Sequence, residues 1–405
     1  MVPSFHELLI LLFETDILFS CGNVMVQQPF IAARFMKGIA FTPSFLLFIF
    51  FLVSCQSKKR QITRSCYYWS SNDYINDSKK AFLKQHAISK VYAKLMDVDW
   101  KQVAGTYPIA AADIEWLDQD LNRNDSLHVG IVPVVFITNK TFLRIGREDI
   151  PLLAKRVARR CFPAYDSTDR AYEKDNMVYY LRERPAGART TPQEVQFDCD
   201  WTPASSANYF YFLRVFKSLL PDSAIRVSAT VRLHQYKYPK KTGIPPVDRG
   251  MLMVYNINDL RQHSSINSIF DYNKAKAYFI AQDYPLPLDV VLPAYSWCIV
   301  FRNKEFFQIK YSIPEETLRS AAFLTPVREN FYRVNQDTVF QDLFLRTGDE
   351  IKLEKIDGQT LLDAATLSAK ALNSDSCSIA LFELSSPEIE KYQYETVEKA
   401  YAAGR

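Results

Sequence analysis

The sequence predicts an α/β protein whose main domain is a closed (β/α)8 TIM-type barrel with a β-hairpin insertion after strand 7. Segments typical of strands and segments typical of helices alternate along the chain, and such alternation produces a parallel sheet. Eight strand segments follow residue 64, and eight units at this length favour a closed barrel over an open sheet. No internal repeat or long low-complexity linker interrupts the series.

The predicted elements follow from hydrophobic periodicity and from turn-forming residues. Strands are expected at residues 65–69, 90–97, 129–138, 194–201, 226–234, 250–256, 290–297 and 378–384. Helices are expected at 77–86, 150–160, 204–220, 273–283 and 360–371. Three prolines predict a loop at 235–247 in place of a helix. The hairpin is predicted at 298–309, with its turn at Asn303 and Lys304.

Composition places the chain among globular proteins. It has 405 residues, of which 48% are hydrophobic and 23% charged, enough for one large domain or two average ones. The net charge of +4 is mild, so nucleic acid is not an expected partner. Five cysteines follow residue 60 without CxxC spacing or a neighbouring histidine pair. They predict buried thiols, and no metal or cofactor is expected.

The amino-terminal segment has the three-part layout of a secretory signal peptide. Lys37 supplies the positive charge, residues 45–53 form the apolar run, and a small residue precedes Cys55. The sequence LVSC at 52–55 resembles the lipobox of bacterial lipoproteins, in which the signal is cleaved before the cysteine and the cysteine is acylated. The alternative is a transmembrane anchor, but the apolar run is shorter than the ~20 residues that a span needs.

These features predict a protein of the bacterial cell envelope that is lipid-anchored through Cys55, on the outer membrane or the periplasmic face. Met36 is a more natural start than Met1, because no basic flank precedes the earlier apolar stretch. The predicted organisation is a mis-called leader (1–35), a lipoprotein signal peptide (36–54), a short tether (55–64), the barrel (65–390) and a C-terminal tail (391–405). The sequence does not indicate an oligomeric state.

The segment EVQFDCDWT, residues 194–202, places two acids at the end of strand four. Thr202 can cap the next helix and Pro203 suits its first turn, so the strand is expected to end near Trp201. Asp198 and Asp200 therefore lie at the carboxyl end of a barrel strand. Active sites of such barrels are found at that end.

Alternation along the strands predicts that charged side chains share the barrel lumen. Asp198 and Asp200 come from strand four, Lys94 from strand two, and Arg232 and His234 from strand five. Unpaired charges would cost several kcal/mol each in such a place. They therefore form either a satisfied layer of salt bridges or a polar site, in which neighbouring carboxylates with separated pKa values supply an acid and a base.

Three short motifs resemble those of family 18 glycoside hydrolases, the chitinase-like barrels. FDCDWT resembles their strand-four D-x-x-D-x-D-x-E, MVYN (253–256) their strand-six M-x-Y-D, and LPAYSW (292–297) the P-x-Y stretch of strand seven. From about Cys66 to Ser385 the chain also resembles uncharacterised bacterial lipoproteins with a glycoside-hydrolase-like barrel. That resemblance is carried by CYYWS, VYAKLMDVDW, FDCDWT and VDRGMLMVYN.

This resemblance implies a carbohydrate ligand but not the usual reaction. The glutamate that protonates the leaving oxygen is replaced by Thr202, whose hydroxyl cannot act as a general acid near neutral pH. Asp200 matches the acid that orients the substrate, and Asn256 replaces an aspartate. A carbohydrate site that does not cleave its ligand is therefore expected. The alternatives are a glycoside hydrolase with a rearranged acid/base formed by Asp198 and Asp200, and another hydrolytic chemistry.

The predicted ligand-binding residues combine polar groups of the lumen with aromatic rings that can stack on sugars. Core packing is the alternative interpretation for each ring. Asp97, Asp99, Asp248 and Glu383 are further carboxylates near strand ends. The residues predicted to bind the carbohydrate are Trp69, Lys94, Arg232, His234, Tyr255, Asn256, Tyr295 and Trp297.

Overall fold

The computed structural model describes residues 60–405, except 71–74, 113, 125–126, 163–190 and 280–283. The predicted leader, the signal peptide and Cys55 lie outside the described residues. No helix within the described ranges is long and apolar enough to cross a membrane.

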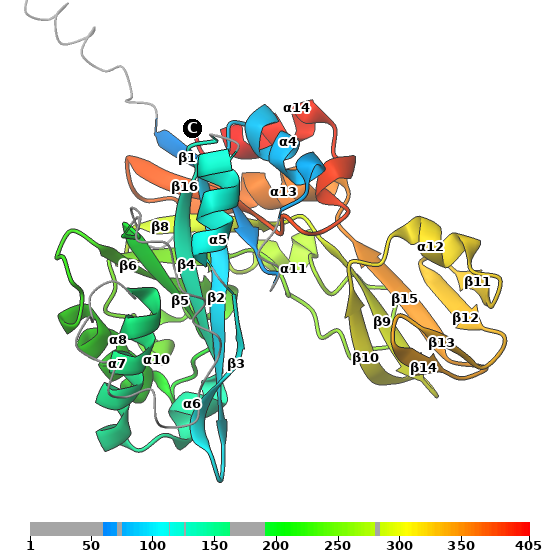
Figure 1. Ribbon diagram of the computed structural model, residues 1–405. Helices are drawn as coiled ribbons and strands as arrows, with labels where there is room; N and C mark the ends of the chain where they lie inside the picture. Colours follow the sequence, from blue (N-terminus) through cyan, green and yellow to red (C-terminus); the bar gives the residue numbers. More distant parts are fainter. Residues whose placement is uncertain (1–59, 71–74, 113, 125–126, 163–190, 280–283) are drawn as a thin grey trace, which may run out of the picture. The chain divides into compact units, whose positions relative to one another are not determined.

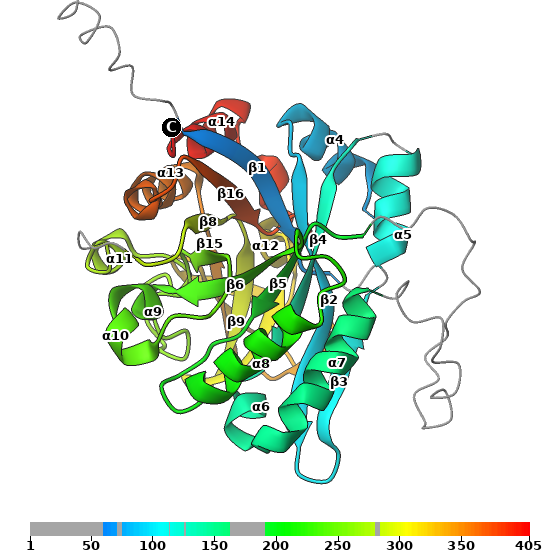
Figure 2. The same cartoon turned by 90° about the vertical axis from the view of Figure 1, so that its left-hand side faces the viewer.

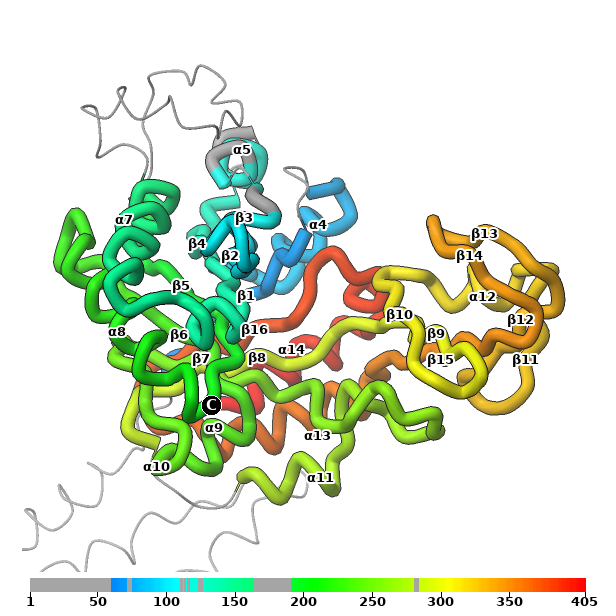
Figure 3. Tube along the Cα trace, turned by 90° about the horizontal axis from the view of Figure 1, so that it is seen from below, coloured from blue at the N-terminus to red at the C-terminus, as the bar shows by residue number. Residues whose placement is uncertain are grey.

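Eight parallel strands form a closed barrel (Figures 1 and 3). Each strand pairs in parallel with the next, and β1 pairs with both β2 and β16, which closes the ring. All eight predicted strands are confirmed, although several end earlier than predicted. They are β1 (Gln61–Tyr68), β2 (Lys90–Lys101), β4 (Gly130–Ile137), β5 (Glu194–Asp198), β6 (Arg226–Arg232), β7 (Arg249–Met253), β8 (Leu288–Pro293) and β16 (Ser376–Phe382).

Helices lie on the outside of the barrel, as Figure 2 shows for α7 and α8. The main ones are α4 (Asp77–Gln85), α5 (Ile114–Asp118), α6 (Asn139–Arg144), α7 (Ile150–Cys161), α8 (Ser206–Ser218), α11 (Tyr272–Lys276), α13 (Gly358–Ser368) and α14 (Tyr394–Ala402). The helix predicted at 273–283 is shorter, because α11 ends at Lys276. The range predicted as a loop, 235–247, instead contains the end of α9 (Leu233–Lys237) and the whole of α10 (Pro239–Thr242), whose first residue is a proline.

The barrel core confirms the predicted outward face of strand four. Phe197 packs edge-on against Phe212 and Phe216 of α8, with ring centroids 5.2 and 4.7 Å apart. Trp201, just beyond β5, is fully buried against Tyr209 of the same helix, and its indole N–H donates to the Thr242 carbonyl (3.0 Å). With these apolar groups outside, the alternate side chains of β5 point into the lumen.

The second barrel strand continues beyond its predicted end. β2 runs to Lys101 and pairs antiparallel with β3 (Gly105–Ala111), an element that the sequence analysis did not predict. The tip of this hairpin, residues 101–104, is exposed to solvent, and its apolar residue Val103 is fully exposed. The carboxyl end of β2 thus extends as a two-stranded hairpin that projects from the barrel (Figure 1).

The insertion after β8 is larger than the predicted hairpin. β9 (Ser296–Arg302) and β10 (Glu305–Tyr311) pair antiparallel and turn at Asn303 and Lys304, both with positive φ. They belong to a five-stranded sheet in the order β10-β9-β15-β12-β11, with β11 (Leu324–Arg328), β12 (Phe331–Val334) and β15 (Glu350–Lys355). The helix α12 (Glu315–Ser320) and the pair β13 (Thr338–Phe340) and β14 (Leu343–Leu345) complete the insertion.

The insertion has its own hydrophobic core. Cys298, Val300, Ile351 and Leu353 on one face of the sheet pack with Leu318 of α12 and other apolar residues. The sequence analysis overlooked β11 to β15 because each of these strands is only three to six residues long. Only the β9–β10 turn carries a strong local signal.

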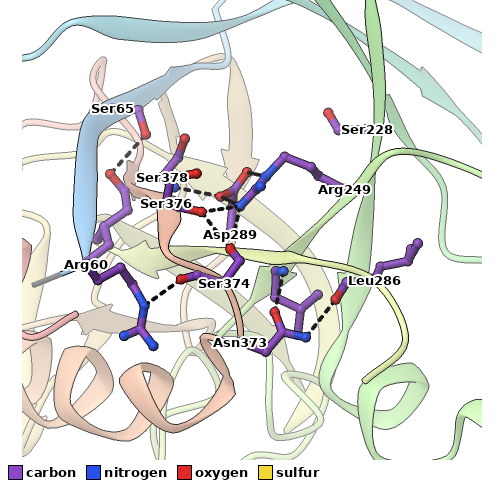
Figure 4. A network of polar contacts seen from close by, with 12 residues as sticks. Arg60, Ser65, Ser228, Arg249, Leu286, Asp289, Asn373, Ser374, Ser376 and Ser378 are labelled. Carbon is purple, nitrogen blue, oxygen red and sulfur yellow. Dashed lines mark hydrogen bonds and ion pairs between the residues drawn. The ribbon is translucent and has the colours of Figure 1, made fainter. Parts of the chain in front are cut away.

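Arginine side chains fasten the end of the barrel at which the strands begin. Arg249 donates to both carboxylate oxygens of Asp289 (3.0 and 2.8 Å) and to the Ser376 carbonyl (2.8 Å), as Figure 4 shows. Arg60 donates to the carbonyls of Ser374, Leu372 and Gly404. β1 thus begins inside the range predicted as tether.

The range predicted as a C-terminal tail holds an ordered helix. Within residues 391–405, α14 buries Val397, Ala400 and Tyr401 against the barrel, and the Tyr401 hydroxyl donates to the Ser65 carbonyl (2.8 Å). All five cysteines beyond residue 60 are unpaired and buried, as predicted.

Phe197→Ala tests the packing between β5 and α8. Because the ring is fully buried between Phe212 and Phe216, we expect its removal to lower the free energy of unfolding by about 3–5 kcal/mol. Denaturant titration measures the change. Phe344→Ala, at a ring that is 50% exposed, is the matched control and should cost less than about 1 kcal/mol. Equal losses in the two variants would contradict this account of the core.

Candidate functional site

Asp198 is the last residue of β5 and points into the lumen. It is 5% exposed, and the Thr230 hydroxyl of β6 donates to its Oδ1 (2.6 Å). Burial raises the pKa of Asp198 to about 6, against the opposing effect of the Arg232 cation. The pKa of this carboxyl is therefore close to neutral pH, and the group lies beneath the surface of the barrel mouth.

Asp200 lies two residues further on and is fixed by an arginine. The Nε of Arg232 donates to Oδ1 of Asp200, and the Nη2 donates to Oδ2 (3.0 Å). The carboxylate is exposed, whereas the guanidinium is largely buried. Although burial opposes the charge, Asp200 and Asp198 hold the pKa of Arg232 above its ordinary value. This two-point geometry fixes both side chains at the mouth.

Lys94 enters the lumen from β2 but pairs with neither of these acids. Its Nζ lies 3.1 Å from Oδ2 of Asp97 and 5.8 Å from the ring centroid of Trp69. The other oxygen of Asp97 is buried and has no hydrogen-bond partner among the described residues. Lys94, Asp97 and Trp69 thus form a second polar group on the β1–β2 side of the mouth.

Aromatic rings line the lumen between the two polar groups. Tyr255 stacks on Phe382 (5.2 Å between centroids) and meets Tyr295 edge-on (5.8 Å). The Tyr295 hydroxyl donates to Oδ1 of Asn256 (2.7 Å), a residue with positive φ after β7. The Tyr255 hydroxyl is buried without a hydrogen-bond partner among the described residues. Buried polar atoms of this kind cost free energy until a partner reaches them.

A further carboxyl, Glu383, follows β16 directly. It accepts hydrogen bonds from the Trp69 amide (2.9 Å) and from the Ser385 hydroxyl. Burial raises the pKa of Glu383 above its ordinary value. The peptide bond before it, between Phe382 and Glu383, is cis.

Two predicted residues lie outside this group. β6 ends at Arg232 and α9 begins at Leu233, so the alternation that placed His234 in the lumen stops before it, and His234 is exposed. Burial of its ring nevertheless lowers the pKa of His234. Trp297 lies on β9 of the insertion, is 4% exposed, and donates through Nε1 to Glu354 (2.7 Å). Its ring centroid is 5.5 Å from that of Tyr295.

The sequence analysis missed three residues that shape the site. Thr230 supplies the hydrogen bond to Asp198, and Phe382 lies beneath Tyr255. Tyr67 stacks on Tyr92 (4.9 Å) inside the lumen and donates to Gln196. Alternation along β1, with Tyr67 on the same face as Trp69, was the available signal.

Thr202 lies between the end of β5 and the start of α8. Its amide donates to Oγ of Ser205 (2.9 Å), and its own hydroxyl is 3.4 Å from the same oxygen. α8 begins only at Ser206, so the chain makes a turn before the helix that Thr202 was expected to cap. No group of three or more histidine, cysteine or acidic side chains among the described residues is placed to hold a metal ion.

No family model matches the sequence, and no curated protein matches it. Among solved structures, the chain is similar to the spore cortex-lytic enzyme SleL of Bacillus cereus (12% identity, 84% of this chain and 75% of that chain, TM-score 0.45). It is also similar to a chitinase from Chromobacterium violaceum (9% identity, 84% of this chain and 99% of that chain, TM-score 0.48). A GH18 chitinase from Cycas revoluta is similar as well (8% identity, 84% of this chain and 99% of that chain, TM-score 0.42). The closed barrel follows from this chain's own strand pairing.

The pH dependence of stability tests the environment of Asp198. Its pKa is raised from 3.8 to about 6, so the folded protein binds the proton more tightly than the unfolded chain. Protonated Asp198 therefore contributes to the free energy of unfolding. This contribution is complete below pH 4 and is lost as the pH rises through 6, a change of roughly 3 kcal/mol. We expect Asp198→Asn to gain stability relative to the wild type from pH 4 to 7, as measured by urea unfolding. Parallel pH profiles would contradict the assignment.

Proposed function

We propose that this protein is a lipid-anchored glycan-binding protein of the bacterial cell envelope, whose barrel mouth binds a carbohydrate without cleaving it. The observation that carries the proposal is the two-point pairing of Asp200 with Arg232, which engages both oxygens of the acid that matches the substrate-orienting position of the hydrolases. Asp198 is buried beneath it and hydrogen-bonded to Thr230. Position 202, which corresponds to the acid/base of the hydrolases, holds a threonine.

The chemistry of proton transfer supports a binding role. A general acid must reach the leaving oxygen to within hydrogen-bonding distance and must be able to release its proton. Both oxygens of Asp200 accept from the Arg232 guanidinium, and Asp198 lies beneath the surface with one oxygen already engaged. Paired charges of this kind offer a fixed set of donors and acceptors for hydroxyl groups.

The rest of the mouth suits a carbohydrate. Tyr255, Tyr295 and Trp69 bring aromatic faces and edges to the lumen beside charged groups, a combination that can contact both the apolar and the hydroxyl-bearing sides of a sugar ring. The hydroxyl of Tyr255 and one oxygen of Asp97 are buried without hydrogen-bond partners among the described residues. A ligand hydroxyl or amide would satisfy these groups.

A rearranged hydrolase is the second candidate, and the pKa of Asp198 favours it. A carboxyl with a pKa of about 6 can donate a proton near neutral pH, and its neighbour Asp200 is paired with Arg232. Glu383, whose pKa is also raised, is a further carboxyl at the same end of the barrel. In this alternative Asp198 acts as the acid, and ligand binding must first expose it.

Reducing-end release separates the two candidates. We expect no release by the purified protein from N-acetylhexosamine-containing or neutral oligosaccharides, together with a rise in melting temperature on binding. Asp200→Asn should remove that rise, because it breaks the charge pairing with Arg232 that orders the mouth. Leu152→Ala, at a side chain that is 50% exposed on α7, is the control. Release by the wild type that Asp198→Asn abolishes would establish the hydrolase instead.

Thr202→Glu tests whether the acid alone is missing. A glutamate here would stand where the hydrolases carry their general acid, with the same Asp200 two residues before it. Because Arg232 engages both oxygens of Asp200, we expect Thr202→Glu to bind the oligosaccharide and still to release no reducing ends. Release at more than ten times the wild-type background would show that the rest of the machinery is intact.

The proposed membrane attachment has its own measurement. Mass spectrometry of the membrane fraction should find a mature chain that begins at acylated Cys55, and Cys55→Ser should shift the protein to the soluble fraction, because the acyl chain is gone. A mature chain that retains residues 36–54 would support the transmembrane anchor and contradict the lipoprotein assignment.

A further inference from the structure

A second cleft lies away from the residues of the mouth. Its volume is about 690 Å³, within the range of sites that hold small molecules. The walls come from α12, the β11–β12 turn, β15, the start of α13 and the loop after β7, and no residue predicted from the sequence to bind a ligand contributes to them. Lining residues from each wall include Glu315, Asn330, Lys355, Thr360 and Asn267.

The walls of this cleft are held in place by their own hydrogen bonds. Glu315 is 14% exposed and accepts from Arg319 and from Lys355. These partners hold the pKa of Glu315 below its ordinary value, Lys355 most strongly. On the opposite wall, Asn267 donates to the Lys355 carbonyl (2.9 Å) and accepts from the Ile269 amide (2.9 Å). The cleft is therefore formed before any ligand enters.

The floor of the cleft contains a buried ion pair. Lys352 and Glu354 are 3% and 1% exposed, and the Lys352 ammonium also donates to the Ile266 carbonyl (2.6 Å). Glu354 accepts from Trp297 (2.7 Å) and from the Ser268 hydroxyl. Trp297 therefore contacts the floor of the cleft from the neighbouring strand β9, and its fluorescence is available as a reporter of binding.

The charges in the cleft indicate a neutral, hydroxyl-rich ligand. Four carboxylates and four cations line it, and the pairs Glu315–Arg319, Glu315–Lys355 and Lys352–Glu354 are already formed. A charged ligand would compete with one of these pairs and face a like charge beside it. Hydroxyl groups both donate and accept, so they can bridge an arginine and a glutamate without separating the pair.

We propose that this cleft binds a short neutral oligosaccharide, as a second site independent of the mouth. Arg319 is the main recognition residue, because its guanidinium is 68% exposed at the edge of the cleft while it pairs with Glu315. The exposed Arg328 and Glu329 on the β11–β12 turn form the opposite edge. The inference stands if the mouth proves to bind nothing.

Calorimetry on the full chain tests this inference, with the neutral N-acetylglucosamine tetramer as the probe. The tetramers of glucosamine and galacturonic acid serve as cationic and anionic comparisons of equal length. We expect Arg319→Ala to weaken binding of the neutral tetramer at one site about tenfold or more, the loss of one charged hydrogen bond. Glu329→Ala should weaken the same site, whereas Glu305→Ala, at an exposed residue on the far edge of the same sheet, should not.

Asp200→Asn separates this site from the proposed function. If Asp200→Asn leaves binding at the Arg319-dependent site unchanged, the second site is supported. If Asp200→Asn also abolishes binding at a different site, the proposed binding of carbohydrate at the mouth is supported as well. A single site that responds only to Asp200→Asn would overturn the second site while leaving the proposed function. Tighter binding of either charged tetramer at the Arg319-dependent site would overturn the neutral ligand class.

Discussion

Ring closure at β1 is the constraint on which the rest of the structure depends. β1 pairs with β2 on one side and with β16, the last barrel strand in the chain, on the other. Arg60 fastens the start of β1 to carbonyls near the C-terminus, and Arg249 ties β7 to β8 and β16 at the same end. Because the ring is closed there, the opposite ends of the strands are held at fixed spacing.

That spacing brings side chains from distant parts of the sequence together. Thr230 reaches Asp198 between neighbouring strands, and Arg232 reaches Asp200 one pair further along. The site therefore holds two carboxylates in different environments. The exposed carboxylate of Asp200 is paired with Arg232, and the buried carboxyl of Asp198 has a raised pKa. Each member of the site owes its environment to the strand beside it and not to its own sequence neighbours. The motif FDCDWT therefore does not determine the chemistry alone.

Much of the barrel was predictable because the strands carry apolar residues at alternate or successive positions, and because α7 and α8 have clear helical faces. Asp200 lies two residues beyond β5 and is held at the mouth by Arg232, the last residue of β6. Asp198 was placed correctly, since alternation on a strand fixes the side to which it points. His234 was not, because nothing local signals that β6 stops at Arg232. Lys94 pairs with Asp97 of its own strand instead of with the acids of β5, and a register shift between Lys94 and Met96 interrupts the alternation there. Alternation along the strand alone did not predict this local pair.

The insertion was the part that sequence reasoning described least, and the way it is joined to the barrel has a consequence for folding. It separates β8 from β16, two strands that must pair before the ring can close. However, its first strand pairs with its last, and Ser296 lies opposite Lys355. The insertion therefore enters and leaves at neighbouring points. Once it has folded on its own core, the entropy lost in bringing β16 to β8 is that of ordering the segment that contains α13 and not that of the whole intervening chain.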